Sequence, residues 1–427
     1  MRWTSLPRPV WQLGWASLFT DAATEMIYPL LPVYLSRVLG VGAMSLGVIE
    51  GVAEGVNSAL KIVSGQLSDR WSRRKPIVIA GYALSSIARP FIALTTSWLQ
   101  VLAIRAVDRT GKGIRGAPRD AMLAQFATTA NRGLVFGFHR AMDHTGAIVG
   151  PLLATAFLLA WPGEYRTLFA LSVVPGALAV WMLLRVPEDA RGAEKTDRAE
   201  NAGPAENSDR AENPGRAPAF DRGATSDPAE NSRRQTASVP ATNSRPLPGR
   251  FWGLMIVLLV FSLGNSADAF LLLRLSSAMG HEAWIPALWA ALHVVKASLS
   301  VYGGALSDRV GRNAVIVAGW AVYAAVYVGF ALVESPAALV ACFLAYGAYF
   351  GLAEGSEKAL VADFAPPERR GAAFGWYNAA IGLGALLASV LFGVLYERFG
   401  HAVAFLTGAG LASLAAVLLV LVPGPRR

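Results

Sequence analysis

Ionisable side chains recur at helical spacing within stretches of the chain that are otherwise apolar. Asp108 and Arg109 lie three and four residues after Arg105, Lys112 lies four and three residues after those two, and Arg119 lies further along the same stretch. On a helix this spacing places them in one stripe. A charge in mid-membrane costs about 2.5–3.5 kcal/mol on insertion scales, so such residues usually face a cavity or one another. The stripe therefore predicts either buried ion pairs or a site for charged molecules and protons.

Other apolar stretches carry ionisable groups at similar spacing. Asp21 and Glu25 lie one turn apart near the middle of the first stretch. A carboxylate desolvated at that depth can exchange protons, so these two are the leading protonation candidates, followed by Asp108 and Asp143. The complete set that we expect around a polar cavity is Asp21, Glu25, Glu54, Lys61, Arg105, Asp108, Arg109, Lys112, His139, Asp143, Asp268, His293, Lys296 and Glu354.

Two interpretations of this set remain open. In the first, the groups form ion pairs that hold helices in register, for example Glu54 or Asp143 against the arginines between 105 and 119. In the second, they line a cavity in which Arg109 and Lys112 hold an anionic group. So many ionisable groups on the early helices favour a polar or charged bound molecule.

Two local patterns resemble ion-binding or phosphate-binding sites but are incomplete. Residues 110–113, Thr-Gly-Lys-Gly, lack both the spacing and the preceding strand of a phosphate-binding loop. His139, Asp143 and His144 could bind a cation, but no further placed ligand accompanies them. The single cysteine, Cys342, excludes a disulfide framework or a thiolate metal site. We therefore expect neither a metal nor a cofactor.

The composition predicts that these charges belong to an integral membrane protein. Of the 427 residues, 54% are hydrophobic and only 16% are charged, whereas a soluble chain is about a quarter charged. Several apolar runs reach the roughly 20 residues that a membrane-spanning helix needs. The stretch that holds the charged stripe has the lowest hydropathy. We place a helix there because the chain must cross the membrane at this point for the later loops to lie on the correct side of it. The twelve expected helices cover 10–38, 44–67, 77–94, 98–115, 134–161, 168–186, 251–279, 284–306, 314–333, 337–361, 372–395 and 402–422.

The composition changes abruptly in the middle of the chain. Residues 187–250 are rich in Ala, Glu, Asn, Pro, Ser and Arg, and the triplet Ala-Glu-Asn recurs. Such a segment has little to bury, so we expect a disordered, solvated linker. The chain then divides into a helical bundle at 1–186, the linker at 187–250, and a second bundle at 251–427.

A charged turn repeats at the same place in each half. The run that begins at Gly65 recurs at Gly304, which is 239 residues later, and Arg132-Gly-x-x-Phe-Gly recurs 238 residues later at Arg370. Two loops in register indicate a duplicated membrane protein. Arginine and lysine gather in the loops on one side, which predicts that this side is cytoplasmic and makes nucleic-acid binding unnecessary to explain the net charge of +9. Both termini and the linker then lie in the cytoplasm.

This pattern resembles the major facilitator superfamily, whose signature turn reads G-x-x-x-D-[RK]-x-G-[RK]-[RK]. Ser72 replaces the second glycine in the first copy, and Asn313 ends the basic pair in the second. The resemblance implies an all-α membrane fold of twelve transmembrane helices in two pseudo-symmetric six-helix bundles, and it implies that the turn is a cytoplasmic latch between them. The alternative is that the turn only anchors the topology. The latch residues are Gly65, Asp69, Arg70, Arg73, Arg74, Gly304, Asp308, Arg309 and Arg312.

A second motif concerns the direction of transport. Gly146, Gly150 and Pro151 resemble the G-x-x-x-G-P element of superfamily exporters that exchange substrate for protons, although the same spacing also serves helix packing. The resemblance implies a secondary transporter that works by alternating access, and we expect proton-coupled export of a small polar or charged compound. The alternative is uptake by proton symport of an organic anion or metal chelate. We expect a monomer in a bacterial inner membrane.

A function of another class, as a membrane enzyme or a transporter-derived sensor, lacks support in the residues. The chain has no recognisable nucleophile–base pair and no soluble signalling domain.

Overall fold

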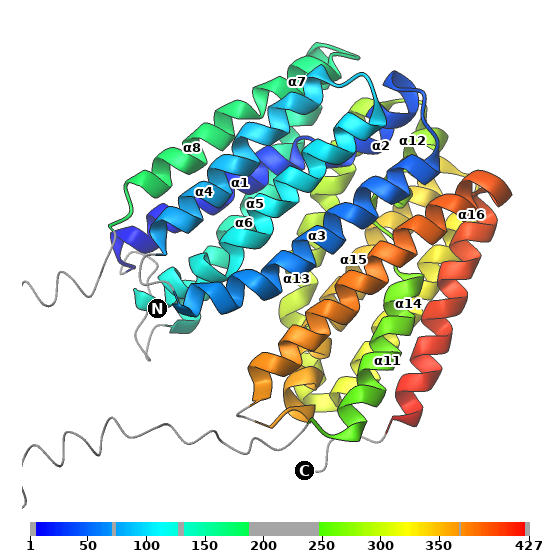
Figure 1. Ribbon diagram of the computed structural model, residues 1–427. Helices are drawn as coiled ribbons and strands as arrows, with labels where there is room; N and C mark the ends of the chain where they lie inside the picture. The colour runs from blue at the N-terminus through cyan, green and yellow to red at the C-terminus, as the bar shows by residue number, and fades with distance from the viewer. Residues whose placement is uncertain (1–5, 71–73, 127–131, 188–246, 367–368, 423–427) are drawn as a thin grey trace, which may run out of the picture. The chain divides into compact units, whose positions relative to one another are not determined.

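The computed structural model describes residues 6–70, 74–126, 132–187, 247–366 and 369–422. Every regular element in these ranges is helical (Figure 1). Seven helical stretches are apolar and long enough to cross a membrane, and helices cover all twelve of the expected segments within the described ranges. The predicted all-α membrane fold is thus confirmed. We call residues 6–187 the first half and residues 247–422 the second half.

The first half begins with a broken helix and continues with longer ones. Pro29 and Pro32 lack the backbone N–H that a helix interior needs, so the expected single helix at 10–38 is wrong and the segment is divided. The elements are α1 (Arg8–Glu25), η2 (Tyr28–Leu30), α2 (Leu31–Val33), η3 (Tyr34–Val38), α3 (Ala43–Arg70), α4 (Lys75–Ala88), η4 (Arg89–Leu94), α5 (Trp98–Gln125), α6 (Arg132–Ala160), α7 (Tyr165–Leu171) and α8 (Val173–Leu184).

Helix α5 carries the charged stripe and is longer than expected. It begins at Trp98 after a capping box, in which the Ser97 side chain and the Gln100 side chain satisfy free backbone N–H groups. Its buried residues include Val101, Arg105 and Asp108, so its charged face lies against other helices. This contact explains why a segment of low hydropathy forms a helix here.

The second half contains one further break. Its elements are α11 (Gly249–Gly264), α12 (Ala269–Met279), η5 (Glu282–Trp284), α13 (Ile285–Val310), α14 (Arg312–Leu332), α15 (Pro336–Phe364) and α16 (Arg370–Leu421). The helix expected at 251–279 is divided between α11 and α12, because polar side chains at 265–268 bond to tyrosines on neighbouring helices. Within α16, Gly400 has φ +85° and separates the two segments that were expected there.

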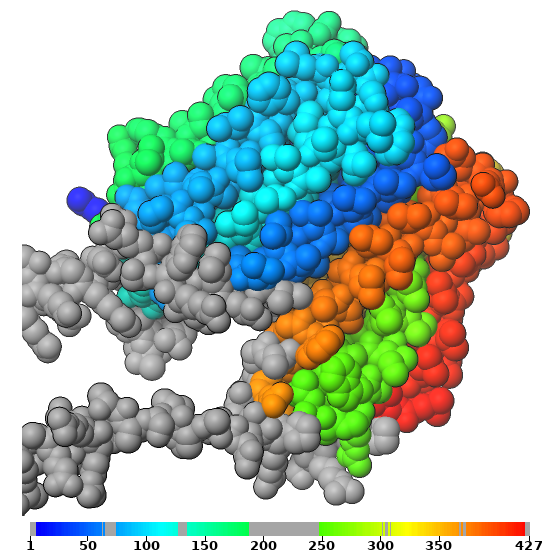
Figure 2. Space-filling model, in the orientation of Figure 1, coloured from blue at the N-terminus to red at the C-terminus, as the bar shows by residue number. Residues whose placement is uncertain are grey.

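The two halves pack most extensively where α3 meets the first part of α16 (Figures 1 and 2). A Cβ added at Gly51 would lie 2.8 Å from the backbone oxygen of Leu386, and one at Gly393 would lie 2.9 Å from that of Ala43. Glycines therefore bring the backbones of the two helices together. A second contact joins α6 and α13.

Both halves belong to one compact unit. The expected linker falls almost wholly outside the described residues. The expected three-part division at 186 and 251 stays a prediction.

Candidate functional site

Buried ion pairs connect three elements of the first half. Arg105 Nη2 of α5 lies 2.7 Å from Glu50 Oε1 of α3, and its Nη1 lies 3.7 Å from Asp108 Oδ2. Arg89 of η4 reaches the other oxygen of Asp108 at 2.9 Å. All four side chains are at most 7% exposed. These pairs hold α3, α5 and η4 in register, which is the first of the two interpretations for Arg105 and Asp108.

Two arginines extend this network to further helices. Arg89 Nη1 donates to the backbone oxygen of Thr20 on α1 at 3.3 Å. Arg115 donates to Ser85 Oγ on α4 at 2.8 Å and lies over the Tyr82 ring at 4.3 Å. The candidate set from the sequence omitted Glu50, Arg89 and Arg115, although each is a charge in an apolar helix and that signal could have found them.

Arg109 differs from the other arginines of α5. It is 9% exposed, it makes no hydrogen bond or ion pair to the described part of the chain, and its Nε is buried without a partner. Its electrostatic neighbours include Glu50 and Asp108, which already pair with Arg105 and Arg89. Glu54 is a further electrostatic neighbour, but no carboxylate of the described residues lies within ion-pair distance of this guanidinium.

Two lysines and a carboxylate share this region with Arg109. Lys61 and Lys112 make no direct polar contact to the described residues, and Lys61 is exposed. Glu54 accepts hydrogen bonds from Asn57 at 3.1 Å and Ser58 at 3.3 Å. Arg109, Lys61 and Lys112 thus have no ion-pair partner among the residues whose surroundings are described.

The carboxylates of α1 are in different surroundings. Glu25 accepts a 2.7 Å hydrogen bond from Trp289 Nε1 of α13, which joins the two halves. Asp21 makes no direct polar contact to the described residues, and its electrostatic neighbours include Asp143 and Lys112. Asp143 of α6 accepts a hydrogen bond from Ser17 and lies 3.6 Å from His139 Nδ1.

An aromatic region in the second half surrounds an ion pair. Asp268, in the break between α11 and α12, lies 3.3 Å from Lys296 Nζ and accepts a hydrogen bond from Tyr346 at 2.8 Å. The Lys296 ammonium also lies 3.6 Å from the centroid of the Phe350 ring. Asn265 donates to the Tyr349 hydroxyl at 3.2 Å. The sequence had indicated Asp268 and Lys296 separately but not the tyrosines.

The two halves meet through side chains beside these groups. Tyr28 and Trp289 lie 5.2 Å apart between ring centroids, and the Nδ1 atom of His293 lies 3.0 Å from the Trp289 backbone oxygen. Arg140 of α6 lies 3.5 Å from Glu354 of α15, which also pairs with Lys358 at 2.8 Å. Glu25 and Glu354 thus contact the opposite half directly, and His293 lies beside Trp289, which contacts it.

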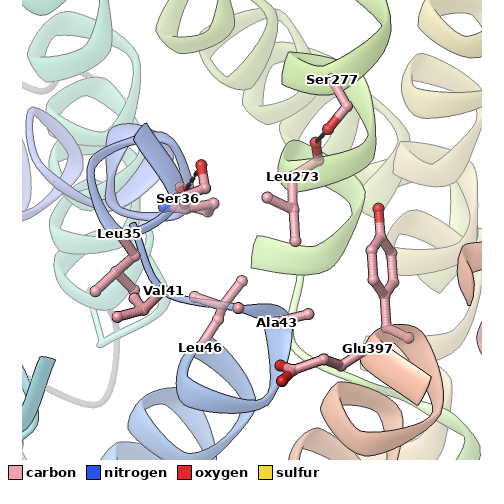
Figure 3. A pocket seen from close by; sticks show the side chains of 11 residues that line it. Leu35, Ser36, Val41, Ala43, Leu46, Leu273, Ser277 and Glu397 are labelled. Atoms are coloured by element: carbon pink, nitrogen blue, oxygen red, sulfur yellow. Dashed lines mark hydrogen bonds between the residues drawn. The ribbon is translucent and has the colours of Figure 1, made fainter. Parts of the chain in front are cut away.

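Acidic residues of the second half also hold the end of the molecule where α3 begins. Glu397 of α16 accepts a 2.8 Å hydrogen bond from the backbone N–H of Met44, and Glu282 contacts both Arg37 and Tyr165. Beside Glu397 is a pocket of about 280 Å³. Figure 3 shows Leu35, Ser36, Val41, Ala43 and Leu46 of the first half facing Leu273, Ser277 and Glu397 of the second.

Much of the expected latch lies outside the residues whose surroundings are described. This applies to Gly65, Asp69, Arg70, Arg73, Gly304 and Asp308. Of the others, Arg312 pairs with Asp363 at 2.9 Å, Arg309 is exposed, and the Nε of Arg74 is buried without a partner among the described atoms. The latch stays a prediction.

The glycine motif of α6 lies against α1. A Cβ added at Gly150 would lie 2.8 Å from Ala22 Cα, and one at Gly146 would lie 3.0 Å from the Leu18 carbonyl carbon. Pro151 follows inside α6. This geometry suits close packing within the first half. In the described ranges no group of three or more His, Cys, Asp or Glu side chains could hold a metal ion.

Comparison with known proteins gives consistent results. The model of the Major Facilitator Superfamily matches residues 13–355 and 283–427. An uncharacterised MFS-type transporter of Methanocaldococcus jannaschii is 30% identical over 424 residues, which are 98% of this chain and 95% of that protein. A multidrug resistance protein, MdtH of Photorhabdus laumondii, is 27% identical over 166 residues, or 38% of this chain and 40% of that protein. The crystal structure of the nucleoside transporter NupG has a TM-score of 0.70 at 13% identity, and the match covers 97% of this chain and 98% of that one.

Proposed function

This chain belongs to the major facilitator superfamily, and from that premise we propose that it is a proton-coupled secondary transporter that exports a small polar or charged compound. The bond between Glu25 and Trp289 carries the proposal, because it places an ionisable group on the contact between the two halves. In transporters of two repeats, one half rocks against the other around a site near the midplane. A proton that binds at this contact can therefore bias the movement.

The physical step is a change in one hydrogen bond. An ionised carboxylate accepts a charge-assisted hydrogen bond, which is roughly twice as strong as a neutral one. Protonation of Glu25 weakens its bond to Trp289 and favours separation of the halves there, while loss of the proton favours their contact. Asp21 lies one turn away on α1 and supplies a second carboxylate that can exchange protons.

The substrate group is held by cations that have no ion-pair partner among the described residues. Arg109 and Lys112 lie one turn apart on α5, and Lys61 projects from α3. The ion pairs around Arg105 and Asp108 keep these helices in place. This arrangement supports a substrate that carries a negative group.

Export is favoured over uptake by two observations. The G-x-x-x-G-P motif of α6 resembles that of proton-exchanging exporters, and one relative is named as a multidrug resistance protein. The alternative is uptake of an organic anion or metal chelate with protons, which the unpaired cations of α3 and α5 would also suit. We further propose that the protein is a monomer of a bacterial inner membrane with both termini in the cytoplasm, and that it is not an enzyme.

Vesicles containing the purified protein and a trapped pH dye test this function. We expect solutes from a panel of organic anions, cations and neutral polar compounds to produce proton movement under an imposed pH gradient. Glu25→Gln and Asp21→Asn should reduce it to the level of empty vesicles. Glu164→Gln, at a solvent-exposed position, is the matched control and should behave as the unmodified protein.

The sidedness of the same flux decides between the two directions. Solute leaving the cytoplasmic side as protons enter supports export, and solute moving together with protons supports uptake. Absence of pH-linked flux for every solute would remove the proposal of proton coupling.

A further inference from the structure

A carboxylate of the second half has no role in the transport steps described above. Glu357 of α15 is 6% exposed. It accepts a hydrogen bond from Trp320 Nε1 of α14 at 2.9 Å, and its other oxygen lies 3.4 Å from the Tyr377 hydroxyl of α16. Both partners are neutral. Among the residues that the structure describes, no cation lies within ion-pair distance of Glu357.

The charged groups around Glu357 form ion pairs with one another. Glu354 and Lys358, on the same helix, pair at 2.8 Å, and Glu354 also lies 3.5 Å from Arg140 of α6. Tyr349 of α15 completes the set of titratable neighbours, together with Tyr377 of α16. None of these neighbours gives Glu357 a positive charge of its own.

A buried carboxylate of this kind is costly to ionise. Transfer of an unpaired charge from water to a protein interior carries a large penalty, and a carboxyl group usually avoids it by taking a proton. The contacts of Glu357 accommodate that proton. Trp320 can only donate, so it bonds to the carbonyl oxygen, while a proton on the second oxygen can be donated to the hydroxyl oxygen of Tyr377.

We propose that Glu357 is a proton-binding site of the second half, and that its carboxyl group is occupied by a proton in the conformation described here. The site is distinct from Asp21 and Glu25, which belong to α1. Glu354 lies one turn from Glu357 and contacts Arg140 of the first half, so separation of the halves changes the field at Glu357. The part of the inference that links this proton to the transport cycle rests on the proposed function.

Infrared spectroscopy of the purified, full-length protein tests the site directly, because the C=O stretch of a protonated carboxyl group is separate from the bands of a carboxylate. We expect a protonated-carboxyl band at neutral pH that Glu357→Gln removes and that alkaline titration bleaches. Glu164→Gln is the matched control and should leave the band in place, because Glu164 lies at a solvent-exposed position away from Glu357 in the sequence. Identical spectra for Glu357→Gln and the unmodified protein in this region would overturn the site.

The pH-driven flux in vesicles tests the link to transport separately. Glu357→Gln, which carries no exchangeable acid, should lose pH-linked flux, and Glu164→Gln, at a solvent-exposed position, should retain it. A protonated-carboxyl band together with normal flux in Glu357→Gln would overturn the link and leave the proton site standing. If the unmodified protein shows no flux, the proposed function fails while the infrared result still decides the site.

Discussion

The buried carboxylates of α3 and α5 in the first half lie against arginines, whereas Asp268 and Glu357 in the second half lie against aromatic donors. Glu50 and Asp108 each contact a guanidinium within 3 Å. Asp268 and Glu357 instead accept hydrogen bonds from Tyr346 and Trp320, and only Asp268 has a cation, Lys296, as a further partner. The two halves share one fold but stabilise buried acidic groups by different means.

This difference determines how much stability is lost when a buried carboxylate is replaced. Removal of one member of a buried ion pair leaves the other charge uncompensated, which typically costs 3–5 kcal/mol. A carboxyl group among neutral donors leaves no such charge behind when it is replaced by an amide. We therefore expect the replacement of Glu50 or Asp108 by an amide to cost more stability than the replacement of Glu357.

The largest effect is expected from Asp108→Asn. The amide no longer compensates Arg89 and Arg105, so the free energy of unfolding should fall by about 3–5 kcal/mol. Denaturant unfolding of the purified protein in detergent measures this change. Asp120→Asn, at an ion pair whose carboxylate is 54% exposed, is the control and should change it by less than about 1 kcal/mol. Equal effects of the two substitutions would contradict a structural role for the buried pairs.

A smaller effect is expected at the aromatic region, from Tyr346→Phe. The substitution removes a hydrogen bond to the charged Asp268, which is typically worth about 1.5–3 kcal/mol, while Lys296 remains in place. Thermal unfolding of the purified protein provides the measurement. Tyr302→Phe, at a position 72% exposed, is the matched control and should leave the midpoint unchanged. An unchanged midpoint for Tyr346→Phe would show that Lys296 alone stabilises Asp268.

The contact between the halves depends on glycine and can be broken without touching any charge. A leucine at Gly51 meets the backbone of Leu386, and overpacking of this kind costs about 1–3 kcal/mol. Gly253→Leu is the control, since an added Cβ there meets nothing within 4 Å. We expect Gly51→Leu alone to lower the unfolding midpoint and to increase labelling of an engineered cysteine at Leu386. Unchanged labelling would mean that the contact accommodates the leucine without separation of α3 and α16.

The smallest effect on stability is expected from Glu357→Gln, and this variant tests the difference between the buried carboxylates of the two halves most directly. The amide keeps an acceptor for Trp320 and a partner for Tyr377, so the free energy of unfolding should change by less than about 1.5 kcal/mol, the net value of one neutral hydrogen bond. Glu50→Gln, its counterpart in the first half, should cost about 3–5 kcal/mol because it strands Arg105. If both changes cost the same under identical denaturant conditions, the two halves do not differ in the way described.

The fold was predictable from the chain to a greater degree than the site. Repetition of the turns at Gly65 and Gly304 indicated the duplication, and counting of crossings placed a helix over the charged stretch that forms α5. The breaks after Glu25 and at Asn265 were missed. The first arises where prolines remove backbone donors, and the second where side chains bond to tyrosines that are far away in the sequence.

The individual site residues show why the rest of the site could not be predicted from the sequence. Glu354 was in the candidate set and Glu357 was not, although they are three residues apart on the same helix. Helical spacing tells which residues share a face but not which neighbour that face meets. Nothing in the sequence distinguished Trp289 from an interfacial or core tryptophan, because its hydrogen-bond partner Glu25 is 264 residues away along the chain. The roles of the candidate residues in binding substrate and protons stay predictions.

The amino-acid sequence by itself determined that this is a duplicated, all-helical membrane protein, because apolar runs of spanning length and repeated charged turns are local properties of a chain. Only the tertiary structure decided which intramembrane charges neutralise each other. Arg105 and Arg109 lie one turn apart and look equivalent in the sequence, yet the first pairs with Glu50 and the second has no partner among the described residues. The reason is physical: the energy of a buried charge depends on distances of a few ångströms to groups on other helices, and helix packing alone sets those distances.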